Sequence, residues 1–233
     1  MIPIELDLPL STDATQTINR GMRICCFFAL TLLLAACGGG NAAPDSAEAL
    51  PVADVMATVA ALPDAAQAEG VLREALRVHP DDPTLLAQLG SLLLRQGKVD
   101  DAARALQRAV DQGNDSVDAL LNLGAAMYQQ GKLDEAIATF ERAQAIAPQD
   151  VDLLYNLGSA YAQKGETAQA IALYRQVTEL DAENALAWFG LGTIYHSEQR
   201  NAEATEALTR FLQLSQDAAL RQRAEEMLRD VQP

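Results

Sequence analysis

The chain has 233 residues and a formal net charge of −15 at pH 7. A surface of that charge repels nucleic-acid phosphates and anionic lipid head groups, so we expect neither as a ligand, although a basic partner is permitted. The same acidic balance also serves solubility alone. All three cysteines, Cys25, Cys26 and Cys37, precede residue 40. The rest of the chain therefore has neither a possible disulfide bond nor a cysteine metal site.

Residues 1–36 are organised as an upstream segment followed by a signal peptide. Arg23 precedes an apolar run over residues 24–36. This run has about the length of a signal-peptide core and is too short to span a bilayer comfortably. Met22 stands where an ordinary signal peptide would begin. Residues 1–21 are thus either a misassigned start, which we favour, or a long n-region, and the true start stays open between Met1 and Met22.

The sequence LAAC over residues 34–37 resembles the lipobox of bacterial lipoproteins. This resemblance implies that Cys37 is lipidated and becomes the first mature residue; an apolar segment that merely ends in cysteine is the alternative. Several acyl chains anchor a protein firmly where one does not. We therefore expect a lipid-anchored protein of the bacterial cell envelope, whose only membrane contact is the lipid. Gly38 lacks the aspartate of inner-membrane retention, so the periplasmic side of the outer membrane is expected in a diderm, and otherwise the outer face of the cytoplasmic membrane.

Residues 37–48 are small residues with Gly and Pro that cannot bury a core, and they predict a flexible linker behind the lipidated cysteine. Residues 49–82 predict a degenerate first helical repeat or an N-terminal cap. Ala68 and Leu72 keep the spacing of the later repeats, but the first helix lacks their leucine-glycine pair.

Four clearer repeats follow at a constant step of 34 residues. They span residues 83–116, 117–150, 151–184 and 185–218. In each repeat, apolar residues spaced i, i+3, i+4, i+7 fall on one helical face. Small residues recur at fixed places, which permits two helix backbones to approach closely. These small residues are Gly90, Gly124, Gly158, Gly192, Ala102, Ala136, Ala170 and Ala204.

Turn and terminal signals agree with helix pairs. Gly97, Gly131 and Gly165 follow the first helix of their repeats, where a left-handed residue commonly ends a helix. The last repeat has Gln199 at this place, which leaves only its turn geometry open. Residues 219–233 predict a C-terminal capping helix, with one apolar face to cover the last repeat and one polar face for water.

The sequence WFGLGTIY over residues 188–195 matches the pattern W-x2-L-G-x2-Y, and Ala136, Phe140 and Pro148 match A-x3-F…P. The chain therefore resembles the tetratricopeptide repeat (TPR) family. The resemblance implies an all-α solenoid of antiparallel helix pairs.

In that family the first helix of each repeat lines the concave surface, so the resemblance assigns a peptide-binding groove to this chain. By repeat position, the candidate groove residues are Leu94, Leu121, Asn122, Tyr128, Tyr155, Asn156, Phe189 and His196. Exposed aromatic rings beside amides suit an extended or helical peptide, because rings supply apolar contact and amides can bond its backbone. The alternative is that the rings pack against neighbouring repeats or are covered by a terminal helix.

The sequence shows no candidate catalytic or metal-binding group around its histidines. His79 and His196 are the two histidines, and neither has a nucleophile, an orienting acid or a metal-ligand partner at suitable spacing. We therefore expect no enzyme activity, no metal and no cofactor.

The sequence thus favours a non-enzymatic scaffold or assembly factor of the bacterial envelope that binds a protein or peptide in the groove. The alternative is a structural subunit of a permanent envelope complex, such as a pilus, a secretin, or outer-membrane or cell-wall machinery, which would use the convex face or the repeat ends. The partner and the oligomeric state stay open.

Overall fold

The computed structural model describes residues 50–231, and this part of the chain forms eleven α-helices and no strand. The all-α prediction is confirmed. The predicted signal peptide, the lipidation site Cys37 and the linker over residues 37–48 lie outside the described residues.

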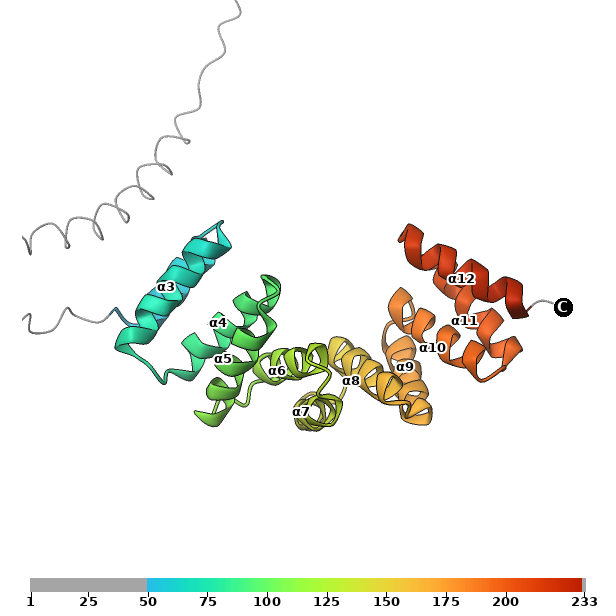
Figure 1. Cartoon of the computed structure of the whole chain (residues 1–233), viewed down its shortest axis with the longest axis horizontal. Helices are drawn as coiled ribbons and strands as arrows, with labels where there is room; N and C mark the ends of the chain where they lie inside the picture. The colour runs from blue at the N-terminus through green and yellow to red at the C-terminus, as the bar shows by residue number, and fades with distance from the viewer. Residues whose placement is uncertain (1–49, 232–233) are drawn as a thin grey trace, which may run out of the picture. The chain divides into compact units, whose positions relative to one another are not determined.

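The helices follow one another as pairs, in chain order from α3 to α12 in Figure 1. Their bounds are α2 Val52–Ala61, α3 Ala65–Val78, α4 Pro83–Arg95, α5 Val99–Asp111, α6 Val117–Gln129, α7 Leu133–Ile146, α8 Val151–Lys164, α9 Thr167–Leu180, α10 Ala185–Ser197, α11 Asn201–Leu214 and α12 Ala218–Val231. Each helix packs against the next one, and α4, α6, α8 and α10 also contact one another in series. We call the surface formed by these four helices the A face. Within residues 50–231, none of the helices combines the length and the apolar composition that crossing a membrane requires.

Side-chain caps fix where the helices of the A face begin. Asp82 accepts hydrogen bonds from the backbone N–H groups of Thr84 and Leu85, both at 2.9 Å. The equivalent residues Ser116, Asp150 and Asn184 accept from backbone N–H groups in the first turns of α6, α8 and α10. Such caps each stabilise a helix by about 1 kcal/mol. The repeat is therefore specified at its start as well as in its core.

The core of a repeat depends on a glycine that faces a large side chain. A Cβ atom at Gly124 would lie 2.5 Å from Cε1 of Phe140, closer than two carbon atoms can approach. Phe140 is 1% exposed, and Ala136 is fully buried beside it. The paired small and large residues therefore let α6 and α7 pack at short distance without a void.

Left-handed residues end the first helix of three repeats, as predicted. Gly97, Gly131 and Gly165 have φ angles of 73°, 75° and 87°. Gln199 adopts the same conformation with φ 59°, although it carries a side chain. The turn of the last repeat thus keeps the geometry of the others in spite of the substitution.

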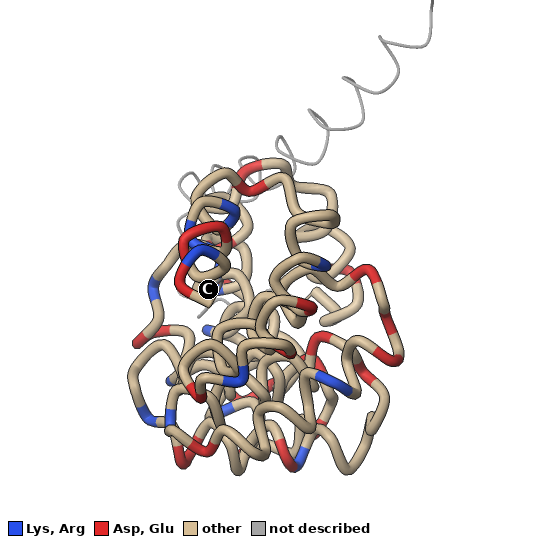
Figure 2. The backbone as a smooth tube through the Cα atoms, turned by 90° about the vertical axis from the view of Figure 1, so that its right-hand side faces the viewer, with Lys and Arg blue, Asp and Glu red and all other residues tan. Residues whose placement is uncertain are grey.

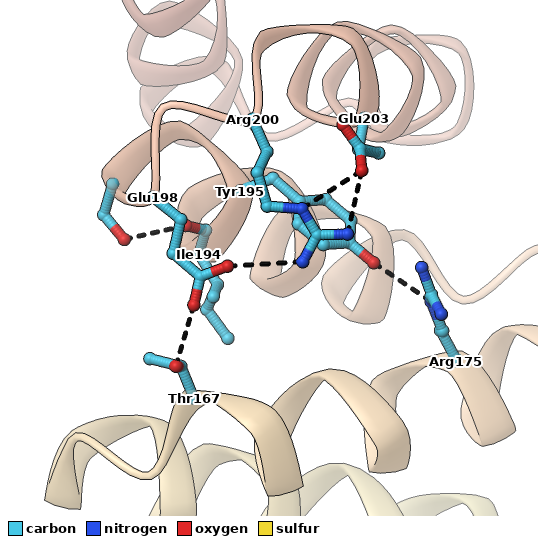
Figure 3. Close-up of polar contacts among 8 residues, drawn as sticks. Thr167, Arg175, Ile194, Tyr195, Glu198, Arg200 and Glu203 are labelled. Atoms are coloured by element: carbon cyan, nitrogen blue, oxygen red, sulfur yellow. Dashed lines mark hydrogen bonds and ion pairs between the residues drawn. The ribbon is translucent and has the colours of Figure 1, made fainter.

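Polar contacts surround that turn and connect α9, α10 and α11 (Figure 3). The Arg200 guanidinium stacks 4.3 Å from the ring centroid of Tyr195, and its Nη2 donates to Oε1 of Glu203 at 2.8 Å. Glu198 accepts from Oγ1 of Thr167 at 2.8 Å, which links the turn to the preceding repeat. These contacts hold the chain on both sides of Gln199.

Terminal helices cover the two ends of the repeats. Val55 and Val59 of α2 are buried in the main core, and Ala224 and Met227 of α12 are buried against α11. Trp188 of α10 is half-buried between these two apolar clusters, and its Nε1 donates to the carbonyl oxygen of Ala182 at 3.0 Å. The apolar face predicted for the C-terminal helix does contact the last repeat.

Figure 2, a view from the C-terminal end, shows charged residues of both signs around the molecule. Arg108 pairs with Asp81 at 2.9 Å, and one repeat later Arg142 pairs with Asp115 at 2.8 Å. All four side chains are more than half exposed, so each pair contributes at most about 1 kcal/mol. These pairs link neighbouring repeats but add little to the stability of the fold.

Candidate functional site

Tyrosine side chains gather where α6, α8 and α9 meet. Tyr128 of α6 and Tyr155 of α8 are half-buried, and both belong to the predicted groove. The ring centroid of Tyr155 lies 5.7 Å from that of Tyr174 in α9, in a tilted arrangement. We call Tyr128, Tyr155 and the buried Tyr174 the tyrosine surface.

Tyr174 reaches the A face because two glycines leave room for its ring. A Cβ atom at Gly158 would lie 2.9 Å from Cε1 of this ring, and one at Gly190 would lie 2.7 Å from Cε2. The Tyr174 hydroxyl then lies 3.0 Å from Oγ of Ser159 in α8. A helix outside the A face thus supplies a hydroxyl to it, which the position rules for the groove did not predict.

Burial affects the phenol groups of Tyr128 and Tyr174. Burial raises the pKa of Tyr174 to about 12, and the hydrogen bond with Ser159 acts in the opposite direction. Burial also raises the pKa of Tyr128, and the neighbouring Tyr155 adds to that increase. Neutral phenols both donate and accept hydrogen bonds. The tyrosine surface therefore offers aromatic area together with hydroxyl groups near neutral pH.

The two predicted amides differ in availability. Nδ2 of Asn156 donates to the carbonyl oxygen of Asp152 at 2.7 Å, so its amide nitrogen is already used within α8. Asn122 lines a pocket of about 310 Å³ between α2, α4 and α6. The other lining residues are Met56, Thr84, Ala87, Gln88, Ser91, Asn114, Ser116, Asp118 and Ala119. This pocket is lined largely by hydroxyl, amide and small side chains.

Leucine side chains supply apolar area on the same helices. Leu94 of α4 and Leu121 of α6 are half-buried and pack against the main core. Each leaves part of its side chain accessible.

Phe189 and His196 lie beside the C-terminal helix. The Phe189 ring centroid is 4.9 Å from that of Phe211, and Arg223 of α12 lies 5.9 Å from the Phe189 ring. Nε2 of His196 is 3.7 Å from a carboxylate oxygen of Asp230, also in α12. The structure thus brings Tyr128 and Tyr155 together with Tyr174, whereas Phe189 and His196 are placed against α12.

Family profiles match most of the described repeats. A profile described as tetratricopeptide repeat matches residues 60–100 and 87–151, one described as TPR repeat matches residues 158–199, and a further tetratricopeptide repeat profile matches residues 185–217. The chain belongs to the tetratricopeptide repeat family. No curated protein sequence is significantly similar to this TPR chain.

Solved TPR structures share its fold. YrrB, described as a TPR protein with an unusual peptide-binding site, superposes with a TM-score of 0.68 at 20% identity, over 77% of this chain and 92% of YrrB. MamA from Desulfovibrio magneticus RS-1 gives 0.66 at 23% identity, over 74% of this chain and 99% of MamA. PilF from Pseudomonas aeruginosa gives 0.64 at 20% identity, over 77% and 86%. At these identities the likeness concerns the fold alone.

TPR arrays are scaffolds for protein interaction, and the side chains on this A face suit binding. Aromatic rings, neutral hydroxyls and amides provide contact area and hydrogen bonds. Among residues 50–231, no three His, Cys, Asp or Glu side chains are grouped as metal ligands would be.

Proposed function

We propose that this TPR protein binds a polypeptide partner on its A face, with the tyrosine surface as the main contact, while a lipid on Cys37 holds it at the bacterial envelope. The observation that carries the proposal is the aromatic area of the half-buried Tyr128 and Tyr155, on the same face as a pocket lined by polar side chains. Tyrosine is enriched in interfaces because its ring supplies apolar contact and its hydroxyl stays paired. The function is that of a non-enzymatic scaffold or assembly factor.

The neighbouring pocket extends the proposed contact surface toward the N-terminal repeats. Asn122 and Gln88 occupy the same position in successive repeats and line it together. Amide side chains can bond both the N–H and the carbonyl groups of a peptide backbone. An extended segment could therefore contact the tyrosine surface with its side chains and the pocket with its backbone.

Photo-crosslinking tests where the partner binds. A photoreactive phenylalanine is placed at Asn122 on the A face, and in a second variant at the exposed Ala172 of α9. In cells that make the protein naturally, we expect a discrete crosslinked polypeptide from position 122 and none from position 172. Crosslinks of equal yield at both positions would contradict binding on the A face.

A second candidate function rests on exposed apolar residues at the ends of α7 and α9. Ile146 and Leu180 lie one repeat apart, and their side chains are 55% and 43% exposed. They favour a structural subunit of a permanent envelope complex that uses this side of the array. Tyr128→Ala/Tyr155→Ala and Ile146→Ala/Leu180→Ala separate the two functions. The first pair removes partner capture if the A face binds, and the second removes it if the helix ends do.

The anchor is tested independently of the partner. The lipobox-like sequence over residues 34–37 supports lipidation of Cys37. Mass spectrometry of the protein from native membranes is expected to find an acylated cysteine as the first residue, and Cys37→Ser is expected to leave the signal peptide uncleaved. An unmodified Cys37 thiol in the native protein would refute the anchor and leave the binding proposal standing.

A further inference from the structure

Two exposed carboxylates on the A face have no cationic partner in the described part of the chain. Asp118 and Asp152 are exposed and lie in the first turns of α6 and α8. Among residues 50–231, the ion pairs formed by Arg, Lys and His include neither carboxylate. Two other acidic residues of the central part of the chain are paired, Asp115 with Arg142 and Asp134 with Lys164. Asp118 and Asp152 are therefore charges of the A face that no ion pair within residues 50–231 neutralises.

Helix geometry places these carboxylates next to the candidate contact groups. Asp152 precedes Tyr155 by three residues, so their side chains are neighbours on one face of α8. Asp118 lines the same pocket as Asn122. α6 itself offers no counter-charge, because it contains no lysine or arginine. The only one in α8 is Lys164, its last residue, which pairs with Asp134 and Glu166.

We propose that the tyrosine surface receives an arginine or lysine side chain from a basic segment of the protein partner. This inference rests on the proposed function and names the chemistry of the ligand. A cation over a tyrosine face is attracted by the ring electrons, and the effect grows when the site is partly desolvated, as at the half-buried Tyr128 and Tyr155. Asp152 adds attraction beside Tyr155, and Asp118 adds attraction farther along the A face, at the pocket that Asn122 lines. The net charge of −15 steers a basic segment toward the molecule.

Other partners fit less well. An acidic or phosphorylated segment would meet the unpaired carboxylates of the A face and would be repelled. A wholly apolar segment would contact the tyrosine rings but would not interact with Asp118 and Asp152. The two carboxylates would then only stabilise the N-termini of their helices. Acidic residues in a first turn do favour the helix macrodipole. The experiment must therefore distinguish this structural role from recognition of a cation.

The probe is N-acetyl-L-arginine methylamide, compared with its neutral isostere N-acetyl-L-citrulline methylamide. Both are titrated into the full chain in a non-ionic detergent, with the tyrosine rings labelled with ¹³C for NMR. We expect saturable shifts of Tyr128 and Tyr155, with an affinity for the arginine probe roughly fivefold higher than for citrulline. Tyr161 and Tyr195 serve as internal references, since they hydrogen-bond Glu141 and Arg175 instead.

Charge-matched variants separate the local site from the overall field. Asp118→Asn/Asp152→Asn is expected to abolish the preference for arginine, whereas Glu179→Gln/Glu206→Gln, which removes two exposed charges from α9 and α11, should preserve it. Equal affinity for arginine and citrulline, or an equal loss in both double variants, would overturn the inference. Crosslinking at position 122 depends on no cation, so a discrete adduct there would show that the proposed function survives such a result.

Discussion

Gly190→Ala tests how the tyrosine surface is built. Gly190 is in the interior of α10, at the repeat position that carries Asn122 and Asn156 in the preceding repeats. Its Cβ atom would lie 2.7 Å from Cε2 and 2.9 Å from Cζ of Tyr174. The ring is 4% exposed and is confined on its other side by Gly158, so it has little space into which to move.

The expected magnitude follows from two opposing effects. Alanine is better than glycine in a helix interior by about 1 kcal/mol. Forcing an extra carbon atom into a well-packed site costs about 1–3 kcal/mol. Gly190→Ala should therefore lower the free energy of unfolding, by up to about 2 kcal/mol.

Gly70→Ala provides the matched control. Gly70 is the sixth residue of α3, as Gly190 is of α10, and a Cβ atom there would meet no atom within 4 Å. The control should raise stability by up to about 1 kcal/mol, since only the helix preference changes. The free energies of unfolding of the two variants should differ by about 1–3 kcal/mol. Both variants replace a helical glycine by alanine, so the helix preference cancels from this difference.

Urea unfolding of the whole chain, followed by far-UV circular dichroism, measures both changes. Repeat arrays can unfold in parts, so the denaturant slope must be equal among the variants for the comparison to hold. The measurement is repeated with Tyr174→Leu, since leucine occupies the equivalent positions 72, 106 and 208. The penalty of Gly190→Ala should then vanish. A penalty that persists without the ring, or that is absent with it, would refute the steric reasoning.

Three further predictions concern the turn, the phenol and a helix cap. Gln199→Gly should raise the free energy of unfolding, measured in urea, by about 0.5–1 kcal/mol, because a φ of 59° strains a residue that has a side chain. A decrease would show that contacts of the glutamine side chain compensate for this backbone strain. The buried neutral Tyr174 should stabilise the fold fully below the ordinary tyrosine pKa of about 10 and lose this contribution as the pH rises toward its folded pKa of about 12. Urea unfolding should therefore show a smaller loss above pH 10 in Tyr174→Phe, and an unchanged loss would exclude this cause. Asn184→Ala removes the side-chain cap of α10 and should lower the free energy of unfolding by about 1 kcal/mol, which is measured as a lower thermal midpoint. An unchanged midpoint would mean that another group accepts the hydrogen bond from the N–H of Ala187.

Much of the fold was predictable because each repeat carries the same local sequence signals. The spacing of leucine, glycine and alanine specifies two helices and their contact, and Gly97, Gly131 and Gly165 specify the turns. Gln199 shows where local rules end. The left-handed turn persists there because the packed helices and the contacts of Arg200 fix the chain on both sides.

The candidate site was predictable in part. Repeat position identified Tyr128 and Tyr155, which are neighbours in the structure. It did not identify Tyr174, because a ring from α9 reaches the A face only where Gly158 and Gly190 both lack a side chain, and these glycines are in different repeats. A tyrosine at a position otherwise filled by Phe140 or leucine was the available signal, since a buried hydroxyl needs a polar neighbour.

Position alone also could not decide what lies beside Phe189. Phe189 has the repeat position of Tyr155, but its neighbours include, besides Phe211 of its own repeat, Arg223 of α12. The identity of that neighbour depends on how residues 218–231 fold, not on the repeat that contains Phe189.

The position of Trp188 makes its fluorescence a probe of the C-terminal helix α12. It is the single tryptophan of the chain and is half-buried between the main core and the cluster beneath α12, whereas the tyrosine surface is formed by α6, α8 and α9. When the protein is excited at a wavelength that only indole absorbs, the fluorescence should therefore change as the C-terminal helix loosens. A ligand on the tyrosine surface should leave the emission maximum and the emission intensity of Trp188 almost constant. Detachment of the last helix and occupation of the tyrosines could thus be followed separately in one unlabelled sample.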